Sequence, residues 1–419
     1  ISKPPFFPKD QNSFIPPKIV ASTATISRAG EQIRSLYGTT QFNLFPPQGL
    51  EFGDTWFSKE MEVSDKFPSR KYVGILGSGY PSMQTAIVRV YASILQAIKP
   101  YSTIPSANYY WTLLGYFNSI RELGGATSLL QSDIRERLWQ IQQRDLVSSN
   151  NRRRIDYNNI ELTSRIKASE IPETLKQLEI DFDPNNTREF AVNSCLATNM
   201  VATGVDISRL GLMCIHGQPK TTAEYIQASS RVGRDLPDGP GLVFSLYSPN
   251  KPRDKSIYEQ FYGYHDRIYS NVEPTSVTPF SINARERGLH AIIIGLIRHF
   301  SSSGLRYLAN KNANEFSIAF QFASDVILKR CNIISPEEKR GTEELINWIR
   351  SFWEKNDFDQ YGDAYNSGIK RNSNFYPLMY SPGVESRGDI YPFESSLPTP
   401  TSMRGVDTES RIKITAGNE

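Results

Sequence analysis

Two stretches of the sequence carry polar residues at spacings that suit phosphate chemistry. The first, "CLATNMVATGVDI", is an apolar run that leads into Thr198 and then into Gly204 and Asp206. The second, "QASSRVGR", holds Arg231 and Arg234 three positions apart. A guanidinium group offers a planar fork of permanently charged donors, which matches the oxygens of a phosphate. On one helix turn the two arginines would project from a single face, and that pairing favours a polyphosphate ligand.

Each stretch taken alone has an ordinary structural interpretation. Arg-x-x-Arg is common on a solvated helix face, and Gly and Asp after a strand are common in a strand–loop turn. Their order and separation are more specific, because one apolar strand and one capped helix start lie between them. That helix start is a capping box, in which Thr221 is paired with Glu224. The strands and helices that position the two stretches therefore decide whether they form a phosphate site or have ordinary structural roles.

Strand and helix patterns alternate between residues 70 and 250, which predicts a parallel α/β sheet. Ligands of such sheets bind beyond the carboxyl ends of the strands. One apolar stretch, "YYWTLLGYFNSIRELGGA", predicts a buried aromatic helix that Gly124 and Gly125 stop. The sequence predicts strands in "KYVGILGSGYP", "IELTSR", "EFAVNSCLATN", "GLMCIHGQP" and "GPGLVFSLYSP", and helices in "SMQTAIVRVYASILQAIK", "SDIRERLWQIQQRD" and "SEIPETLKQLE".

The regions on either side of this segment have other patterns. "KIVASTATI" predicts a short strand, and "SRAGEQIRSLYG" predicts a helix that Gly38 closes. Beyond about residue 255 the strand patterns stop, and apolar residues recur at helical spacing in stretches such as "INARERGLHAIIIGLIRHF" and "EELINWIRSFWEK". From Asn372 the chain is rich in Pro, Ser and Gly, which predicts an extended tail.

Composition limits the class of protein. The chain has 419 residues, 39% of them hydrophobic, and a net charge of +3, so a local groove for nucleic acid is neither required nor excluded. Its three cysteines show no disulfide or zinc spacing, which predicts a reducing, cytoplasmic location and no metal site. The longest apolar run, "LHAIIIGLI", is shorter than the roughly 20 residues of a membrane span, so we expect no membrane contact.

Together the two stretches resemble motifs V and VI of superfamily 2 helicases, and "STAT" (residues 22–25) resembles motif III. The three occur in the order of the family, and the resemblance covers residues 18–250. "GQPKTTAEYIQASSRVGR", "RELGGA" and "SVTPFS" further resemble the large helicase subunit of bacterial DISARM phage-defence systems. The resemblance implies a RecA-like parallel sheet flanked by helices and followed by a mostly helical domain. The expected parts are the end of a first RecA-like domain with motif III and a linker (1–60), a second RecA-like domain (61–255), a helical domain (256–371) and an extended tail (372–419).

The resemblance also implies roles on the nucleotide side. Arg231 and Arg234 match the arginine fingers of motif VI, which reach the γ-phosphate of ATP and stabilise charge during its transfer. Gln227 matches the leading glutamine of that motif, a contact to nucleotide or water. Gly204 and Asp206 match motif V positions that couple the bound nucleotide to nucleic acid. ATP and Mg²⁺ are therefore the implied cofactors.

Other matching residues belong to the nucleic-acid side. Thr198 and Asn199 match positions that touch the nucleic-acid backbone. Thr23 and Thr25 match positions that link the state of ATP to strand binding. The sequence departs from motif V at Thr203, where the family often has arginine, so no additional phosphate contact is expected there.

The motifs that hold ATP are missing from this sequence. It contains no G-x-x-x-x-G-K-[ST] phosphate loop, and no Asp-Glu pair precedes Thr23. In the family these elements lie in the first RecA-like domain. We therefore expect the C-terminal half of a longer ATP-dependent helicase or translocase that acts on DNA, with ATP and Mg²⁺ held mainly by the upstream domain and with no ATPase activity in the isolated chain. The alternative is a non-catalytic helicase-like module that binds nucleic acid or a partner subunit of a defence complex.

Weaker features each have a functional and a structural interpretation. Gly77 and Ser78 follow a strand where motif IV would fall, and they suit either a nucleic-acid phosphate or a plain strand–helix turn. Arg152–Arg154 suit a DNA backbone, although a solvated loop is the favoured interpretation. Trp111 suits stacking on a base, but its helical spacing favours the core. His216, in an apolar strand, is expected to be a core histidine.

Overall fold

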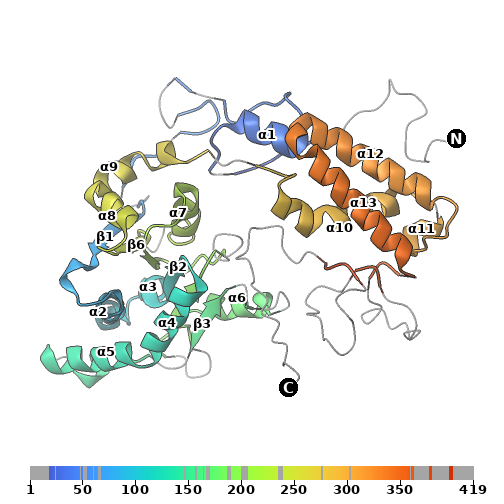
Figure 1. The fold of residues 1–419 in the computed structure, drawn as a ribbon. Helices are drawn as coiled ribbons and strands as arrows, with labels where there is room; N and C mark the ends of the chain where they lie inside the picture. Colours follow the sequence, from blue (N-terminus) through green and yellow to red (C-terminus); the bar gives the residue numbers. More distant parts are fainter. Residues whose placement is uncertain are drawn as a thin grey trace, which may run out of the picture. The chain divides into compact units, whose positions relative to one another are not determined.

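The computed structural model of the chain contains two compact units (Figure 1). One takes in the described residues of Ser22–Ser27 and Leu44–Pro274 and holds the sheet. The other takes in those of Ile1–Ala21, Arg28–Asn43 and Thr275–Glu419 and is helical. The four-part division expected from the sequence stays a prediction. The structure describes residues 18–23, 25–47, 49–50, 54–59, 61–64, 68–145, 148–155, 158–163, 165–166, 170–185, 190–199, 206–234, 239–274, 277–301, 303–358, 360–362, 377–379 and 396–399.

The described strands of the first unit form one parallel sheet. They are Lys71–Leu76 (β1), Leu113–Phe117 (β2), Asn159–Leu162 (β3), Ser194–Ala197 (β4), Leu212–His216 (β5) and Leu242–Tyr247 (β6). Their order across the sheet is β1-β6-β5-β2-β4-β3, and every neighbouring pair is parallel. All carboxyl strand ends therefore lie at one edge and all amino ends at the other. The predicted parallel α/β class is confirmed.

Helices connect these strands or follow the last of them. They are Met83–Ile98 (α2), Ala107–Trp111 (α3), Ile120–Gln131 (α4), Asp133–Arg144 (α5), Ile171–Glu179 (α6), Thr222–Ser229 (α7), Pro252–Glu259 (α8) and Phe261–Asp266 (α9). Polar side chains bond the free amides at several helix starts. The Ser82 side chain accepts from the amide of Thr85 at the start of α2. Thr221 and Glu224 complete the capping box of α7, so that prediction is confirmed.

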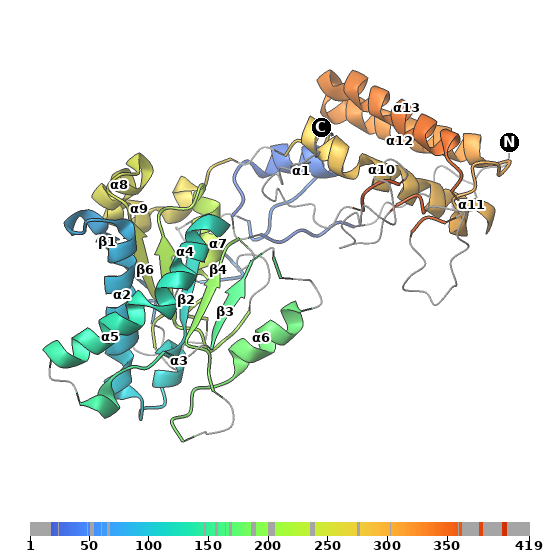
Figure 2. The same ribbon diagram turned by 60° about the horizontal axis from the view of Figure 1, so that its bottom comes forward.

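The central strands of the sheet are buried on both faces, because their side chains alternate between two cores. In β2, Leu113 and Phe117 join the core formed with α2, α4 and α5. Leu114 and Tyr116 join the core formed with α6, α7 and α9. Figure 2 shows the strands between the helices of these two layers. A strand buried on both faces is a continuous apolar run without polar alternation.

The stretch "YYWTLLGYFNSIRELGGA" is not one helix, so that prediction is wrong. It divides into α3, β2 and the start of α4, and α4 continues through Gly124 and Gly125. All side chains of β2 are buried, and such a short apolar run cannot be told from a helix by its periodicity. The strand predicted in "KIVASTATI" is also wrong. Residues 18–23 are exposed and form no strand, because no neighbouring strand pairs with them.

The second unit is a set of packed helices. They are Ala29–Tyr37 (α1), Ile282–Phe300 (α10), Ser303–Tyr307 (α11), Phe316–Ile334 (α12) and Lys339–Lys355 (α13). Trp353 is fully buried in their core, and its indole N–H donates to the carbonyl of Ala309 at 3.1 Å. Gly38 closes α1 with a φ of +70°, as predicted. The mostly helical character expected for the C-terminal region is confirmed.

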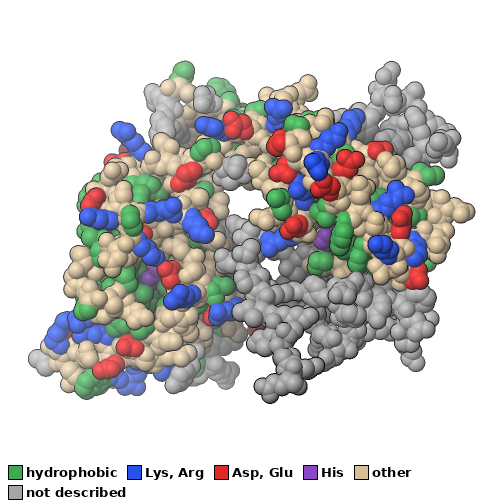
Figure 3. Space-filling view, in the orientation of Figure 1, with side chains coloured by type: hydrophobic (Ala, Val, Ile, Leu, Met, Phe, Trp, Pro, Cys, Tyr) green, Lys and Arg blue, Asp and Glu red, His purple; other side chains and the backbone are tan. Residues whose placement is uncertain are grey.

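Charged side chains of both signs are interspersed over the surface that Figure 3 shows, in agreement with the small net charge. The longest apolar run lies in α10, where Ile293, Ile294 and Ile297 are buried in the core of the helical unit. Among the helices that the structure describes, none has both the length and the apolar character needed to cross a membrane.

Candidate functional site

The arginines of "QASSRVGR" lie in a turn after α7 and not on the helix. The helix ends at Ser229, and Gly233 has a φ of +73°. The expectation that Arg231 and Arg234 share a helix turn is therefore wrong, because the left-handed backbone of the glycine breaks the helical path. Arg231 is half-buried and Arg234 is exposed. Residues 230–234 form the finger segment.

Several contacts fix the backbone of the finger segment. Val232 is fully buried in the core with α7, and its carbonyl accepts from Arg70 Nε at 2.7 Å. The amide of Gly233 donates to the carbonyl of Leu210 at 2.9 Å. A Cβ at Gly233 would lie 2.7 Å from the Cα of Gly241, so this close backbone approach needs glycine. Because Arg70, Leu210 and Gly241 precede β1, β5 and β6, the segment is held at the amino edge of the sheet.

The structure forms two pairs among the residues predicted to bind nucleotide or to couple it to the strand. Gln227 Nε2 donates to Thr25 Oγ1 at 2.9 Å, across 202 positions of sequence. The guanidinium of Arg234 forms an ion pair with Asp206, and its Nε donates to the carbonyl of Ser230 at 3.2 Å. The Arg234 side chain is 32% exposed and that of Asp206 69%. An ion pair this open to water contributes little free energy, so Arg234 can exchange its partner readily.

Three further residues named in the sequence analysis are Thr23, Thr203 and Gly204. Thr23 Oγ1 accepts from the amide of Thr25 at 3.2 Å, and this local turn presents Thr25 to Gln227. Gly204 and Thr203 lie outside the described residues, so their roles stay predictions. Within the described part of the chain, no group of His, Cys, Asp and Glu side chains is arranged to hold a metal ion.

The residues predicted to contact nucleic acid lie at the carboxyl edge of the sheet. Thr198 and Asn199 directly follow β4, and Tyr116 Oη donates to Asn199 Oδ1. After β1 comes the 3₁₀ turn Gly77–Gly79 (η2), in which Gly77 is buried and Ser78 is exposed. Four strand spacings separate β1 from β4 in the sheet order, which corresponds to roughly 19 Å. Both positions are therefore on one edge, but they do not touch.

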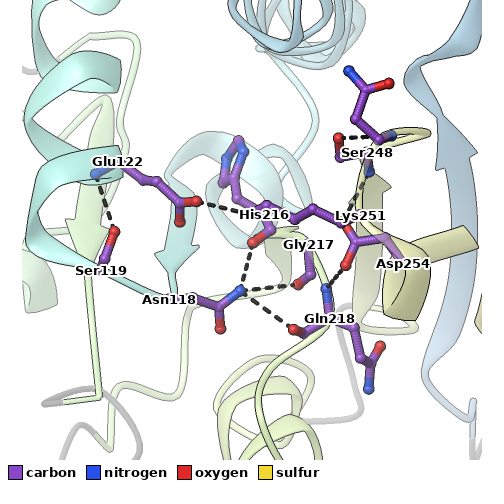
Figure 4. A network of polar contacts seen from close by, with 10 residues as sticks. Asn118, Ser119, Glu122, His216, Gly217, Gln218, Ser248, Lys251 and Asp254 are labelled. Carbon is purple, nitrogen blue, oxygen red and sulfur yellow. Dashed lines mark hydrogen bonds and ion pairs between the residues drawn. The ribbon is translucent and has the colours of Figure 1, made fainter.

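Between them the carboxyl edge is closed by a polar network that the sequence patterns did not reveal (Figure 4). Asn118, directly after β2, donates through Nδ2 to the carbonyl of His216 at 2.9 Å. The buried Asp254 of α8 accepts from the amides of Gln218 at 2.9 Å and Ser248 at 2.8 Å. These bonds join the ends of β2, β5 and β6. Asn118 was missed because the run before it was predicted as a helix, which hid its place at a strand end.

His216 is a core histidine, as expected. Its Nε2 is 2.8 Å from Tyr91 Oη, and its ring stacks on Phe117 at 4.0 Å between centroids. Burial, and secondarily the charge of Lys251, lowers its pKa to about 3. The ring is therefore neutral near pH 7 and serves to pack the strand end.

Known proteins give two matches to this chain in sequence. Residues 130–235 match the family described as helicase conserved C-terminal domain, a range that ends just after the finger segment. The chain is also 40% identical over 414 residues to the DISARM protein DrmA of Bacillus paralicheniformis. That match covers 96% of this chain but spans 35% of the length of the relative. The predicted resemblance to a helicase C-terminal domain and to the DISARM subunit is confirmed.

Solved structures give weaker likenesses. The DUF1998 helicase MrfA, bound to DNA and AMPPNP, has a TM-score of 0.38 at 16% identity, over 70% of this chain and 32% of that one. The helicase Lhr of Mycobacterium smegmatis, bound to ssDNA and AMP-PNP, has a TM-score of 0.34 at 11% identity, over 64% and 28% of the two chains. At these values the likeness says nothing about individual site residues.

Proposed function

Because the chain is related to the DISARM protein DrmA and carries a helicase conserved C-terminal domain, we propose that it forms the second half of an ATP-dependent DNA helicase or translocase. In this proposal the finger segment serves the nucleotide, and the carboxyl edge of the sheet serves the strand. A preceding RecA-like domain supplies the phosphate loop and holds Mg²⁺. The complete protein works in the bacterial cytoplasm with a partner subunit of a defence complex.

One observation carries the proposal: Gln227 of α7 pairs with Thr25, and Arg234 of the finger segment pairs with Asp206. They come from three separate stretches of sequence, and no local spacing requires their contact. Their side chains offer amide, hydroxyl and guanidinium donors, and Arg231 adds a second guanidinium in the same segment. This donor set fits a nucleotide polyphosphate, because arginine binds phosphate oxygens through paired, charge-assisted hydrogen bonds.

In the proposed mechanism, Arg234 exchanges its ion pair with Asp206 for a phosphate of the nucleotide. ATP, when bound, supplies the phosphoryl group that is transferred to water. Arg231 and Arg234 then donate to the phosphate oxygens and stabilise the charge that develops there, while Gln227 orients water. When Arg234 leaves Asp206 for phosphate, the carboxylate is released from the finger segment.

Release of Asp206 also links the nucleotide to the strand-binding edge. Asp206 lies in the connection between β4 and β5, and Thr198 and Asn199 begin the same connection. In this proposal, the connection transmits the release of Asp206 to Thr198 and Asn199. Contacts to phosphates fix the position of a strand without reading its sequence, which suits a motor that moves along DNA.

The proposal is tested by Arg231→Ala in the intact gene product. The matched control is Arg340→Ala in α13, whose side chain is 91% exposed. We expect DNA-stimulated ATP hydrolysis to fall by about 10³-fold, since an arginine finger acts on the transition state. DNA affinity, measured by fluorescence anisotropy, should stay close to that of the control.

Two other outcomes would count against the proposal in different ways. If Arg231→Ala retains ATP hydrolysis, Arg231 is not an arginine finger, although the proposal of an ATP-dependent motor still stands. If the unaltered protein binds DNA or a partner but hydrolyses no ATP, the chain is a non-catalytic helicase-like module and the motor proposal fails.

A further inference from the structure

A basic pocket lies at the amino edge of the sheet, beside the end of α2 and the connection from α3 into β2. Figure 2 shows the course of these elements. Its volume is about 440 Å³, within the range of small-ligand sites. Ile155, in the loop that borders it, joins the core with α2, α4 and α5, whereas Val232 of the finger segment joins the opposite core. The pocket is therefore separate from the motif contacts. Its lining residues are Lys99, Trp111, Asn150, Arg152, Arg153 and Arg154.

The loop that carries the three arginines has a fixed backbone. The amide of Arg153 donates to Gln96 Oε1 at 2.9 Å, and Gln96 Nε2 donates to the carbonyl of Asn151 at 2.8 Å. Arg152 is extended, and successive side chains of an extended chain point to opposite sides. Arg153 is accordingly buried, while Arg152 is half-buried and Arg154 is exposed. The loop thus presents two guanidinium groups on the side away from the core.

Arg153, at the centre of the loop, has a structural role. It is 1% exposed, and Nη2 donates to Asn193 Oδ1 at 2.9 Å. Its guanidinium lies 3.2 Å from the ring centroid of Trp111, and Phe182 stacks on the same indole at 3.4 Å. Two groups this close cannot share one face, so both faces of Trp111 are covered. The prediction that Arg153 lies in a solvated loop is therefore wrong. The prediction that Trp111 packs in the core is confirmed, and its indole is not open for stacking on a base.

Charge is the chemistry that the pocket offers. Lys99 Nζ lies 5.9 Å from the ring centroid of Trp111. Burial lowers the pKa of Lys99, and the charges of Arg153 and Arg154 lower it further. An anion among these groups would relieve their repulsion. None of the described lining residues is acidic, and Asp156, the next acidic residue along the chain, lies outside the described residues.

We propose that this pocket binds the phosphate groups of an anionic ligand through Lys99, Arg152 and Arg154. The two guanidinium groups donate to phosphate oxygens, and the ammonium group adds a point charge. The pocket has room for more than one phosphate, so the ligand is a free polyphosphate or consecutive phosphates of a nucleic-acid strand. The site goes beyond the proposed motor, because no motif residue lines it.

The test is the double variant Arg152→Gln with Arg154→Gln in the full chain. It removes two charges and leaves the buried Arg153 in place. The matched control, Lys329→Gln with Lys339→Gln, removes two charges from exposed positions of the helical unit. Binding of inorganic pyrophosphate is measured by calorimetry, and binding of labelled single-stranded DNA by anisotropy at several salt concentrations. Thermal unfolding shows that each variant is folded, and no step depends on ATP hydrolysis.

A free polyphosphate ligand predicts that pyrophosphate affinity falls tenfold or more in the double variant, while DNA affinity equals that of the control. A strand ligand predicts that DNA affinity falls and that its slope against log salt decreases by about 1.4, which is 0.7 for each lost single-strand phosphate contact. Arg152→Lys with Arg154→Lys should restore part of the affinity. If both affinities match those of the control, the pocket is not a phosphate site.

Discussion

The carboxyl edge of the sheet bonds its polar groups to one another, whereas the amino edge holds arginines that bond to backbone carbonyls or exchangeable partners. At the carboxyl edge, Asn118 and Asp254 join the ends of three strands through hydrogen bonds, and those of Asp254 are buried. At the amino edge, Arg70 holds the finger segment, and Arg234 is paired with an exposed carboxylate. The first arrangement fixes geometry, and the second leaves charge available to ligands.

This difference has an energetic basis. A buried hydrogen-bonded group is costly to leave without its partner, whereas an exposed ion pair can be broken at little cost. Variants at the carboxyl edge should therefore lower stability, and variants of exposed arginines at the amino edge should lower ligand affinity or rate. Stability measurements on variants of each edge test this difference between the two edges.

The largest effect on stability is expected for Asp254→Ala. It leaves the buried amides of Gln218 and Ser248 without their acceptor, at about 2 kcal/mol each, so the free energy of unfolding should fall by about 4 kcal/mol. Asp254→Asn keeps one acceptor oxygen and should lose about half as much. Denaturant unfolding measures both variants. Equal, small losses would show that the network does not hold the carboxyl edge together.

Gly233→Ala is an exception to this division between the two edges, because it lies at the amino edge and should still lower stability. The alanine must adopt a left-handed backbone, and its Cβ would clash with Gly241, so we expect a loss of about 3 kcal/mol. Gly124→Ala is the matched control. Its Cβ meets nothing within 4 Å in the middle of α4, so it should gain up to about 1 kcal/mol. Similar melting temperatures for the two variants would contradict the described path of the finger segment.

A smaller effect, dependent on pH, is expected from His216. Its pKa is about 3 in the folded protein and about 6.5 when unfolded, so the unfolded chain takes up the proton first as pH falls. The contribution of the neutral ring is complete above about pH 6.5 and decreases toward pH 3. Between pH 7 and pH 5 the loss is about 2 kcal/mol.

His216→Gln isolates this contribution. The variant should lose about 2 kcal/mol less stability than the unaltered protein between pH 7 and pH 5. Burial also lowers the pKa of His265 and His290, and both residues are retained in the variant, so their effects cancel. The same pH dependence in both proteins would mean that His216 is not buried as described.

Much of the fold could be predicted from the sequence where patterns were strong. The capping box at Thr221, the glycine cap at Gly38 and the long periodic helices after residue 255 are local signals, and the structure confirms them. Strand β2 could not be predicted, because a central strand has no polar face to mark its period. Because β2 was not predicted, Asn118, which joins the ends of β2 and β5, was also missed.

The site was predicted in part. Motif order pointed to Gln227, Asp206 and Arg234, and the structure brings each of them to a partner. Sequence spacing alone gave the wrong geometry for the two arginines, because a single left-handed glycine redirects the chain after α7. No sequence pattern indicated the role of Arg70, and Arg153 was interpreted as part of a solvated or DNA-binding loop, since their partners lie far away in sequence.

Helix α7 spans the distance between the two edges of the sheet. Its start is capped by Thr221 and held by Glu273, whose carboxylate accepts from the amide of Thr222 at 2.8 Å. Its end leads directly into the finger segment. The helix has 8 residues, which is about 12 Å, and an unbroken ladder of hydrogen bonds makes it stiff. It therefore sets a constant spacing between its capped start and the arginines that follow its end.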